Sequence, residues 1–427
     1  MIKKVLAGSA VVALALTASG CSASESEDGP ITLTFEALAW QTTSIEANQA
    51  IVAEWNEQNP DVQVEYLQGD WGSIRDELTT AFEGGTGPDL FHYYDTGLQP
   101  FAERGNLLDL SDYLSEEFVA SIGDQSWKNV SFRELEGVWG VPFLVEPILV
   151  FANATMLADA GIAAPTVDDP WTWDEYQEVA RQLTTGDTYG SAMPLMNRAD
   201  LIIGLGHSFN ASYFNEDGTA LEWGAAEAEV PLRVHSMLHD DQSMPLEVLG
   251  LGPEDVVPGF LSGRFATIFG GSYLRQQFEE GKTDGFEWIA VPTLVGVDQA
   301  TPNGSQTISI SAQTEHPEEA AAFLEFMLNG QNQARLAVGD WLAPTNVNAV
   351  DAPEFQDSTL GWDVTIASAA NLEQARYQQV PGWDEWAERV GHAGFMAYFA
   401  NEITLDELIE RFESEGNPVL ERAAARR

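Results

Sequence analysis

The stretch from Gly137 to Asn153 constrains the fold more than any other part of the chain. Residues 141–151 are nearly all apolar and strand-forming, which is typical of a strand that runs through a buried sheet. Glu146 and Pro147 interrupt this run. Because an unpaired carboxylate is costly to bury and proline is rare in a central strand, we predict a crossover between two lobes, with Glu146 facing the gap. The alternative is a bulged core strand whose glutamate is satisfied by hydrogen bonds inside the protein.

The first thirty residues predict export. Lys3 and Lys4 precede an apolar run over residues 5–16, which is too short to span a membrane as a mature helix. Residues 18–21 read A-S-G-C, which resembles a bacterial lipobox, where the chain is cut before the cysteine and the new terminus is acylated. Cys21 is the only cysteine, so it forms no disulfide within the chain. We expect a signal peptide over residues 1–20, a lipidated Cys21 and a flexible tether over residues 21–30. The alternative is a secreted protein with a free N-terminal cysteine.

The charge of the chain excludes some classes of partner. It has 67 acidic and 19 basic residues, which gives a net charge of −48, and the acidic residues are spread along the whole sequence. Nucleic acid and anionic membrane surfaces are therefore excluded as main partners. The spread of charge favours a hydrated surface over a role in capturing cations. No second apolar run reaches the length of a membrane span, so we expect the lipid to be the only membrane anchor.

The first part of the mature chain alternates strands and helices. The pattern predicts strands over residues 31–40, 62–67 and 90–94, and helices over residues 45–58 and 73–82. This order is typical of an open, mainly parallel sheet, in which ligands bind at the carboxyl ends of the strands. The polar and aromatic residues at those ends form a candidate site: Trp40, Gln41, Asp70, Trp71, Tyr93, Tyr94 and Asp95.

The rest of the chain mixes strands and helices without an internal repeat. Thr172 and Glu175 have the spacing of a capping box that begins a helix ending near Leu183. Further strands are predicted over residues 189–193, 266–269, 286–291 and 307–311, and further helices over residues 154–161, 201–209, 230–239 and 317–328. After residue 344 the chain is predicted to be mostly helical. The length of 427 residues suits two or three domains.

Seven short motifs occur in order at residues 35–40, 55–64, 85–89, 137–142, 172–175, 263–266 and 318–324. Together they resemble the extracellular solute-binding proteins of ABC transporters, most closely the maltose-binding type that handles sugars and oligosaccharides. The resemblance covers essentially the whole mature chain. It implies an α/β fold of type II with two lobes, each a mainly parallel sheet flanked by helices, joined by crossing hinge segments. The implied lobes are residues 31–144 plus 304–338 and residues 145–303 plus 339–427.

The resemblance also implies a function and its partners. The protein is expected to be a monomer that captures a mono- or oligosaccharide and delivers it to permease subunits with a separate ATPase. It is expected to have no catalytic activity, cofactor or metal, and to lie on the outer face of the cytoplasmic membrane or in the periplasm. The sequence has no P-loop, G-x-S-x-G or H-E-x-x-H motif, which agrees with a separate ATPase.

The implied site extends beyond the first strand ends. Positions carried over from the family are Trp40, Gln41, Asp95 with Tyr93 or Tyr94, Glu146, Asn197, Arg198, Gly271, Ser272, Tyr273 and Trp383 or Trp386. Tyr273 stands where the family has a tryptophan, which leaves the particular sugar open.

The chemistry of a sugar agrees with this set of residues. A sugar has hydroxyls on its rim and C–H groups on its faces, so charged and amide groups suit the rim and aromatic rings suit the faces. The first group is Asp95, Glu146, Asn197 and Arg198, and the second is Trp40, Trp71, Tyr273, Trp341 and Trp383. Trp55 and Trp173 lie inside predicted helices, and we assign them to the core.

Four alternatives compete with sugar capture. His235 and His239 have a spacing that can chelate zinc, but a solvated helix face is the simpler interpretation. Tyr93 and Tyr94 are similar to the paired tyrosines of ferric-ion binders. Two carboxylates across a sugar site also suit a secreted glycosidase. Finally, acidity combined with aromatic residues suits a polyamine or another cation.

Overall fold

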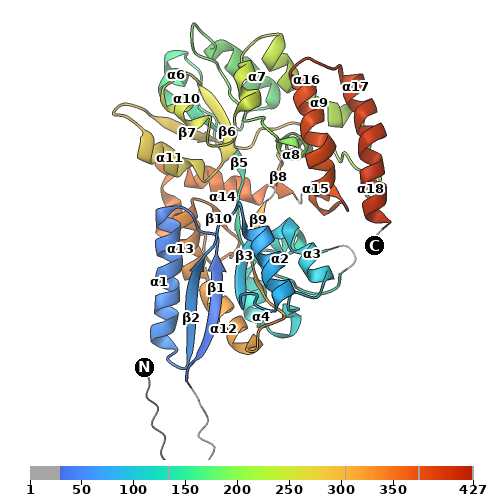
Figure 1. The fold of residues 1–427 in the computed structure, drawn as a ribbon. Helices are drawn as coiled ribbons and strands as arrows, with labels where there is room; N and C mark the ends of the chain where they lie inside the picture. The colour runs from blue at the N-terminus through green and yellow to red at the C-terminus, as the bar shows by residue number, and fades with distance from the viewer. Residues whose placement is uncertain (1–28, 133–134, 303, 374–375, 426–427) are drawn as a thin grey trace, which may run out of the picture.

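The computed structural model describes residues 29–132, 135–302, 304–373 and 376–425, and it has two lobes, each built on its own β-sheet (Figure 1). The predicted signal peptide, Cys21 and most of the tether lie outside the described residues. Within the described part, no helix has both the length and the apolar composition that crossing a membrane requires.

The sheet of the first lobe contains six strands. Their order is β10 (Ala343–Pro344), β4 (Val141–Val145), β9 (Ser305–Ile310), β3 (Leu90–Tyr94), β1 (Ile31–Ala37) and β2 (Val62–Gln68). β1 is parallel to β2 and β3, as the sequence predicted. β9 is antiparallel to β3 and β4, and β10 is antiparallel to β4. The prediction of a mainly parallel sheet is therefore correct for the first three strands and wrong for the other half, because those strands arrive from the crossing segments.

The sheet of the second lobe is smaller and antiparallel. β5 (Ile148–Asn153) lies between β6 (Thr267–Gly271) and β7 (Trp288–Val291), and it is antiparallel to both. The predicted mainly parallel sheet is wrong for these strands. Residues 189–193, predicted as a strand, contribute only isolated parallel bridges to the region of β6. A separate parallel pair is formed by β8 (Thr301–Pro302) and β11 (Leu372–Glu373).

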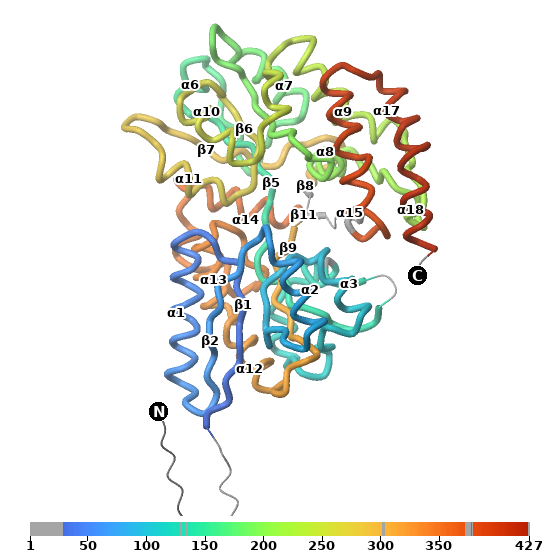
Figure 2. Tube along the Cα trace, viewed as in Figure 1, coloured from blue at the N-terminus to red at the C-terminus, as the bar shows by residue number. Residues whose placement is uncertain are grey.

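Helices cover both sheets, and Figure 2 follows the chain through them. The first lobe carries α1 (Thr42–Gln58), α2 (Ile74–Gly84), α3 (Gln99–Glu103), α4 (Glu116–Ser121), α5 (Asp124–Asn129), α12 (Pro317–Met327) and α13 (Gly330–Asp340). The second carries α6 (Ala154–Asp159), α7 (Trp173–Leu183), α8 (Ala199–Gly206), α9 (Ala225–His239), α10 (Val257–Leu261), α11 (Leu274–Gly281), α15 (Trp383–Trp386), α16 (His392–Phe399), α17 (Leu405–Arg411) and α18 (Asn417–Ala424). α14 (Trp362–Ala370) lies between the lobes (Figure 1).

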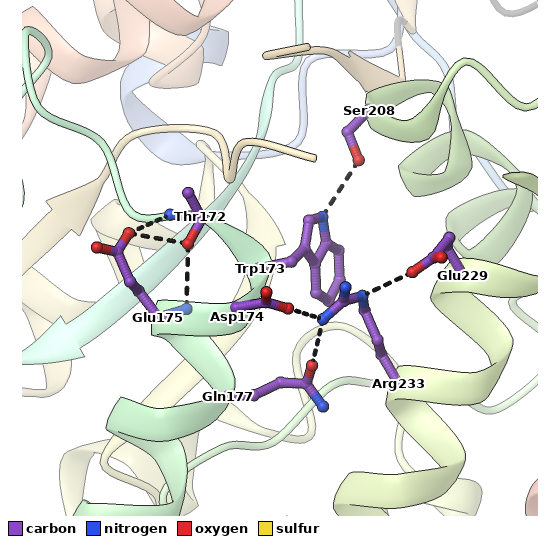
Figure 3. Close-up of polar contacts among 8 residues, drawn as sticks. All are labelled: Thr172, Trp173, Asp174, Glu175, Gln177, Ser208, Glu229 and Arg233. Atoms are coloured by element: carbon purple, nitrogen blue, oxygen red, sulfur yellow. Dashed lines mark hydrogen bonds and ion pairs between the residues drawn. The ribbon is translucent and has the colours of Figure 1, made fainter. Parts of the chain in front are cut away.

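The beginning of α7 shows how local sequence and packing agree. The Thr172 hydroxyl accepts a hydrogen bond from the Glu175 backbone N–H, and the Glu175 carboxylate accepts one from the Thr172 N–H, which is the predicted capping box (Figure 3). Trp173 is 1% exposed and its indole N–H donates to Ser208. Arg233 of α9 donates to Asp174 of α7 and fixes the two helices together (Figure 3). The core assignments of Trp173 and of Trp55 are confirmed.

The main hydrophobic clusters follow the two sheets, with one difference from the expected division of the chain. Leu342, Phe355 and Trp362 pack in the cluster of the first lobe, and β10 pairs with β4. Val364, two residues further on, packs in the cluster of the second lobe. From the sequence, all of residues 339–427 were expected to lie in the second lobe. We therefore propose that the boundary lies inside α14, near residue 362.

A buried arginine ties the two lobes together. Arg275 of α11 donates through Nε to the Ser272 carbonyl at 2.8 Å, and through its two terminal nitrogens to the carbonyls of Leu360 and Trp341 at 2.8 and 2.7 Å. Its guanidinium lies 4.1 Å from the centre of the Trp362 ring. Burial lowers the pKa of Arg275 to about 9. We call this set of contacts the Arg275 junction.

A second contact between the lobes lies on another side of the molecule. Arg75 of α2 and Asp384 of α15 form an ion pair between two exposed side chains. Hydrogen bonding to Asp384 raises the pKa of Arg75 against the lowering effect of desolvation. Exposed pairs of this kind are weak, about 0–1 kcal/mol.

Candidate functional site

A cavity of about 530 Å³ lies where residues from the two lobes meet. Its aromatic lining is Trp40, Trp71, Tyr94 and Tyr273, and its carboxylates are Asp70, Glu146, Glu254 and Asp340. The lining is completed by Gly304, Ser305, Gln306 and Leu342. A concave site with aromatic walls and a few polar groups is the usual form of a small-molecule binding site.

The fold explains why these residues meet. Trp40 follows β1, Asp70 and Trp71 follow β2, and Tyr94 ends β3, so all four lie at the carboxyl edge of the parallel strands. Glu146 lies between β4 and β5, and Tyr273 follows β6. These six residues were predicted from the sequence, and the structure brings all of them to one cavity.

The aromatic residues of the cavity form pairs. Trp40 is 51% exposed, and its ring meets that of Tyr273 edge to face, with 6.0 Å between ring centres. This pair joins the two lobes. Trp71 lies 6.5 Å from Tyr94 with an angle of 30° between the rings. The Asp70 carboxylate accepts the Gly72 backbone N–H and so shapes the turn that carries Trp71.

Glu146 faces the cavity, so of the two interpretations of the crossover the structure shows the cleft-facing one. Its Oε1 lies against the backbone of Gly271, where an added Cβ would be 2.0 Å away. A side chain at this position would force the Glu146 carboxylate and the Tyr273 ring to shift, so the predicted Gly271 leaves room for both. Burial raises the pKa of Glu146 to about 7; the Arg198 guanidinium opposes this rise, whereas Glu254 adds to it.

The second-lobe polar loop lies beside the cavity without lining it. Arg198 is partly buried and pairs with Asp200 at 3.1 Å. It acts on the cavity through its charge, which stabilises ionised Glu146. Asn197 is exposed and has a φ of 55°, in the left-handed region that asparagine tolerates.

Three predicted site residues do not line the cavity but contact residues that do. Asp95 is buried and accepts hydrogen bonds from the backbone N–H groups of Ser305 and Thr96, while burial raises its pKa to about 7. Tyr93 is buried and its hydroxyl donates to that of Tyr94 at 3.2 Å. The Gln41 amide donates to the Tyr273 carbonyl at 3.4 Å. These side chains hold lining residues in place, and Asp95 does not face Glu146 across the cavity as a glycosidase pair would.

Three further predicted residues are structural in this arrangement. The Ser272 hydroxyl donates to the Trp341 carbonyl at 2.9 Å. The Trp341 ring stacks on Trp362, with 5.8 Å between ring centres and 14° between planes. Trp383 is 8% exposed and packs against Tyr377 in the second-lobe cluster. None of the three lines the cavity, because each is held by packing within or between the lobes.

Six of the twelve lining residues were not predicted from the sequence. Ser305 and Gln306 begin β9, whose amino end reaches the site because β9 is antiparallel to β3. Asp340 ends α13 and is 6% exposed, and burial raises its pKa to about 6 while the Ser44 hydroxyl opposes the rise. Glu254 lies in the loop before α10 and accepts a hydrogen bond from the Tyr273 hydroxyl at 2.8 Å. The residues next to Glu254 in the sequence form no motif that would have predicted a binding site there.

The histidine pair weighed as a zinc site is engaged in other contacts. The ring nitrogen of His239 lies 2.9 Å from the Phe399 carbonyl, and that of His235 lies 3.4 Å from the Asn401 side chain. Among the described residues, no three His, Cys, Asp or Glu side chains are grouped so that they could hold a metal ion.

Comparison with known proteins agrees with this architecture. Residues 39–334 match the family model of bacterial extracellular solute-binding proteins. The sequence is 37% identical to an uncharacterized lipoprotein from the oleD 5′ region of Streptomyces antibioticus, over 93% of this chain and 89% of that protein. The fold is similar to the sugar-binding protein MalE from Xanthomonas citri, with a TM-score of 0.79, 19% identity and coverage of 92% and 98%. It is also similar to an ABC substrate-binding protein from Listeria monocytogenes in complex with cycloalternan, with a TM-score of 0.74, 20% identity and coverage of 91% and 99%. The predicted two-lobed fold is thereby confirmed.

Proposed function

Because the chain belongs to the bacterial extracellular solute-binding proteins, we propose that it captures a sugar or oligosaccharide outside the cell for an ABC importer. Two solved structures of similar fold are described as a sugar-binding protein and as an ABC substrate-binding protein in complex with cycloalternan. The importer supplies the permease and the ATPase, and this chain supplies only recognition of the solute.

The observation that carries the proposal is the lining of the cavity. Trp40 and Trp71 offer apolar ring faces that exclude water from the C–H surface of a sugar. Carboxylates such as Glu146 and Asp70 offer acceptors for the hydroxyls on its rim. A site of about 530 Å³ falls within the range of small-molecule sites. The pair of carboxylates predicted for a glycosidase, Asp95 and Glu146, is not formed, because Asp95 does not line the cavity.

A sugar panel tests the proposal. The purified protein is titrated calorimetrically with malto-, xylo-, galacto- and chito-oligosaccharides, and products are then analysed for shortened chains. Binding of at least one saccharide, with no shortening, is expected. Loss of that binding in Trp71→Ala, with Trp127→Ala as the control outside the cavity, locates it. If no saccharide binds, the proposed function is wrong.

We also propose that ligand binding closes the lobes, since the cavity takes its walls from both of them. Small-angle scattering should show a smaller radius of gyration when the saccharide is bound. An unchanged radius at saturation would count against closure.

The family describes extracellular proteins, and one relative is named as a lipoprotein. We propose that the mature protein is a monomer anchored to the outer face of the cytoplasmic membrane by an acylated Cys21. Mass spectrometry of the native N-terminus should find an acylated cysteine, and Cys21→Ser should release the protein from the membrane fraction. Retention of the variant would refute the anchor.

A further inference from the structure

The charged residues that line the cavity are all acidic. Four of its lining residues are carboxylates, and none of the described lining residues is lysine, arginine or histidine. The carboxylates come from both lobes: Asp70 and Asp340 from the first, Glu146 and Glu254 from the second. An overall acidic surface does not explain this fully, because Glu146 is partly buried and Asp340 is buried, although Asp70 and Glu254 are exposed at the mouth of the cavity.

The groups around these carboxylates leave most of the charge uncompensated. Arg198 is the cation that acts on Glu146, but Asp200 shares it through the ion pair at 3.1 Å. Glu254 receives the neutral Tyr273 hydroxyl, and Asp70 receives the neutral Gly72 N–H. Asp340 is 6% exposed, and the group that lowers its pKa is a hydroxyl, not a cation.

A neutral sugar would close the cleft over this negative charge without offsetting it. Such burial is costly, and the raised pKa values of Glu146 and Asp340 report that cost in the ligand-free protein. A protonated amine would offset it through charge-assisted hydrogen bonds. The Trp40 and Tyr273 rings, which lie at the same place, would add cation–π attraction.

We propose that the natural solute carries a protonated amine, as an amino sugar does, and that this amine binds between Glu146 and Glu254 beside Tyr273. The inference rests on the proposed sugar-binding function and narrows its substrate class. Tyr273 lies next to both carboxylates: its hydroxyl donates to Glu254, and its pKa is raised first by burial and then by the charges of Glu146 and Glu254. A positively charged group should therefore bind most favourably beside the hydroxyl and ring of Tyr273.

Matched saccharides test the amine separately from the sugar. The protein is titrated at pH 7 with trimers of glucosamine and of N-acetylglucosamine, with maltotriose, and with spermidine as an amine without a sugar ring. We expect the glucosamine trimer to bind at least about tenfold more tightly than either neutral trimer, the difference expected of one hydrogen bond to a charged group.

Variants then place the amine. Glu254→Gln should reduce the affinity for the glucosamine trimer about tenfold and bring it close to that of the neutral trimers. Glu117→Gln, at an exposed glutamate outside the cavity, should leave every affinity unchanged. A melting curve for each variant confirms that the fold is intact.

The outcomes separate the two proposals. If a neutral trimer binds as tightly as the glucosamine trimer, the amine inference is wrong and sugar capture stands. If spermidine binds and no saccharide does, recognition of an amine stands and sugar capture is wrong. If no probe binds, both are wrong.

Discussion

Replacing Glu146 with glutamine should stabilise the ligand-free protein, by an amount that grows as the pH rises from about 4.5 to 7 and then levels off. The substitution keeps the shape of the side chain and its place against Gly271, but it removes the charge. Binding sites often keep such unfavourable charges because the ligand compensates for them.

The magnitude follows from the pKa of Glu146, which is about 7 in the folded protein against 4.5 for an unperturbed glutamate. Since one pKa unit corresponds to about 1.4 kcal/mol, ionised Glu146 costs the folded state about 3 kcal/mol at pH 8. A group with a raised folded-state pKa contributes stability that is fully present below about pH 4.5. That contribution is lost as the pH rises through 7.

Urea denaturation of wild type and Glu146→Gln at pH 4.5 and pH 8 measures the effect. The stability advantage of the variant should be about 2–3 kcal/mol larger at pH 8 than at pH 4.5, whereas Glu117→Gln should show no such difference. Asp95 and Asp340 also have raised pKa values, but they are present in both proteins and cancel. An advantage that is equal at the two pH values would refute the reasoning, because it would show that the charge of Glu146 is not buried at a cost.

Three further changes test other parts of the structure. Trp383→Ala should lower the free energy of unfolding by about 3–5 kcal/mol, because it empties a packed core position. Trp71→Ala should instead weaken saccharide binding about tenfold or more and leave the melting temperature nearly unchanged. The reverse pattern would contradict the placement of both rings. Gly271→Ala should weaken saccharide binding, because the added methyl would displace the Glu146 carboxylate and the Tyr273 ring, and a titration with wild-type affinity would show that their present positions are not needed. Arg75→Ala should weaken binding by less than about fivefold by removing the ion pair to Asp384, and the loss should vanish at high salt; a loss that persists there would assign Arg75 a role beyond the pair.

The part of the site that the sequence predicted is the part that follows from strand periodicity. Trp40, Trp71 and Tyr94 come directly after or at the ends of strands whose pattern is clear, and parallel strands bring such ends together. Glu146 was predicted because a charge inside an apolar run needs a physical reason. The capping box that begins α7 was also predicted correctly, because it depends only on residues that are close together in the sequence.

What the sequence did not predict depends on pairings between distant segments. Ser305 and Gln306 reach the site only because β9 runs antiparallel to β3, and no local pattern states that direction. Trp383 was assigned to the site and lies in the core, since an aromatic residue at the beginning of a helix looks the same in both roles. Asp340 is adjacent to the predicted Trp341, yet it is the aspartate that faces the cavity.

The Arg275 junction determines how the molecule can open. A buried cation that donates to carbonyls of both lobes cannot lose either set without leaving its charge unsatisfied. We therefore expect the hinge to lie on the side of the molecule near α11 and α14. The opposite side, where α2 and α15 face each other in Figure 1, carries the exposed Arg75–Asp384 ion pair and a hydrogen bond from the Gln379 amide to the Ser131 carbonyl at 3.4 Å, and it should move farthest. The solute should enter between the lobes on the side of α2 and α15. A permease that separates the lobes would act most effectively on that side, because it is the farthest from the hinge.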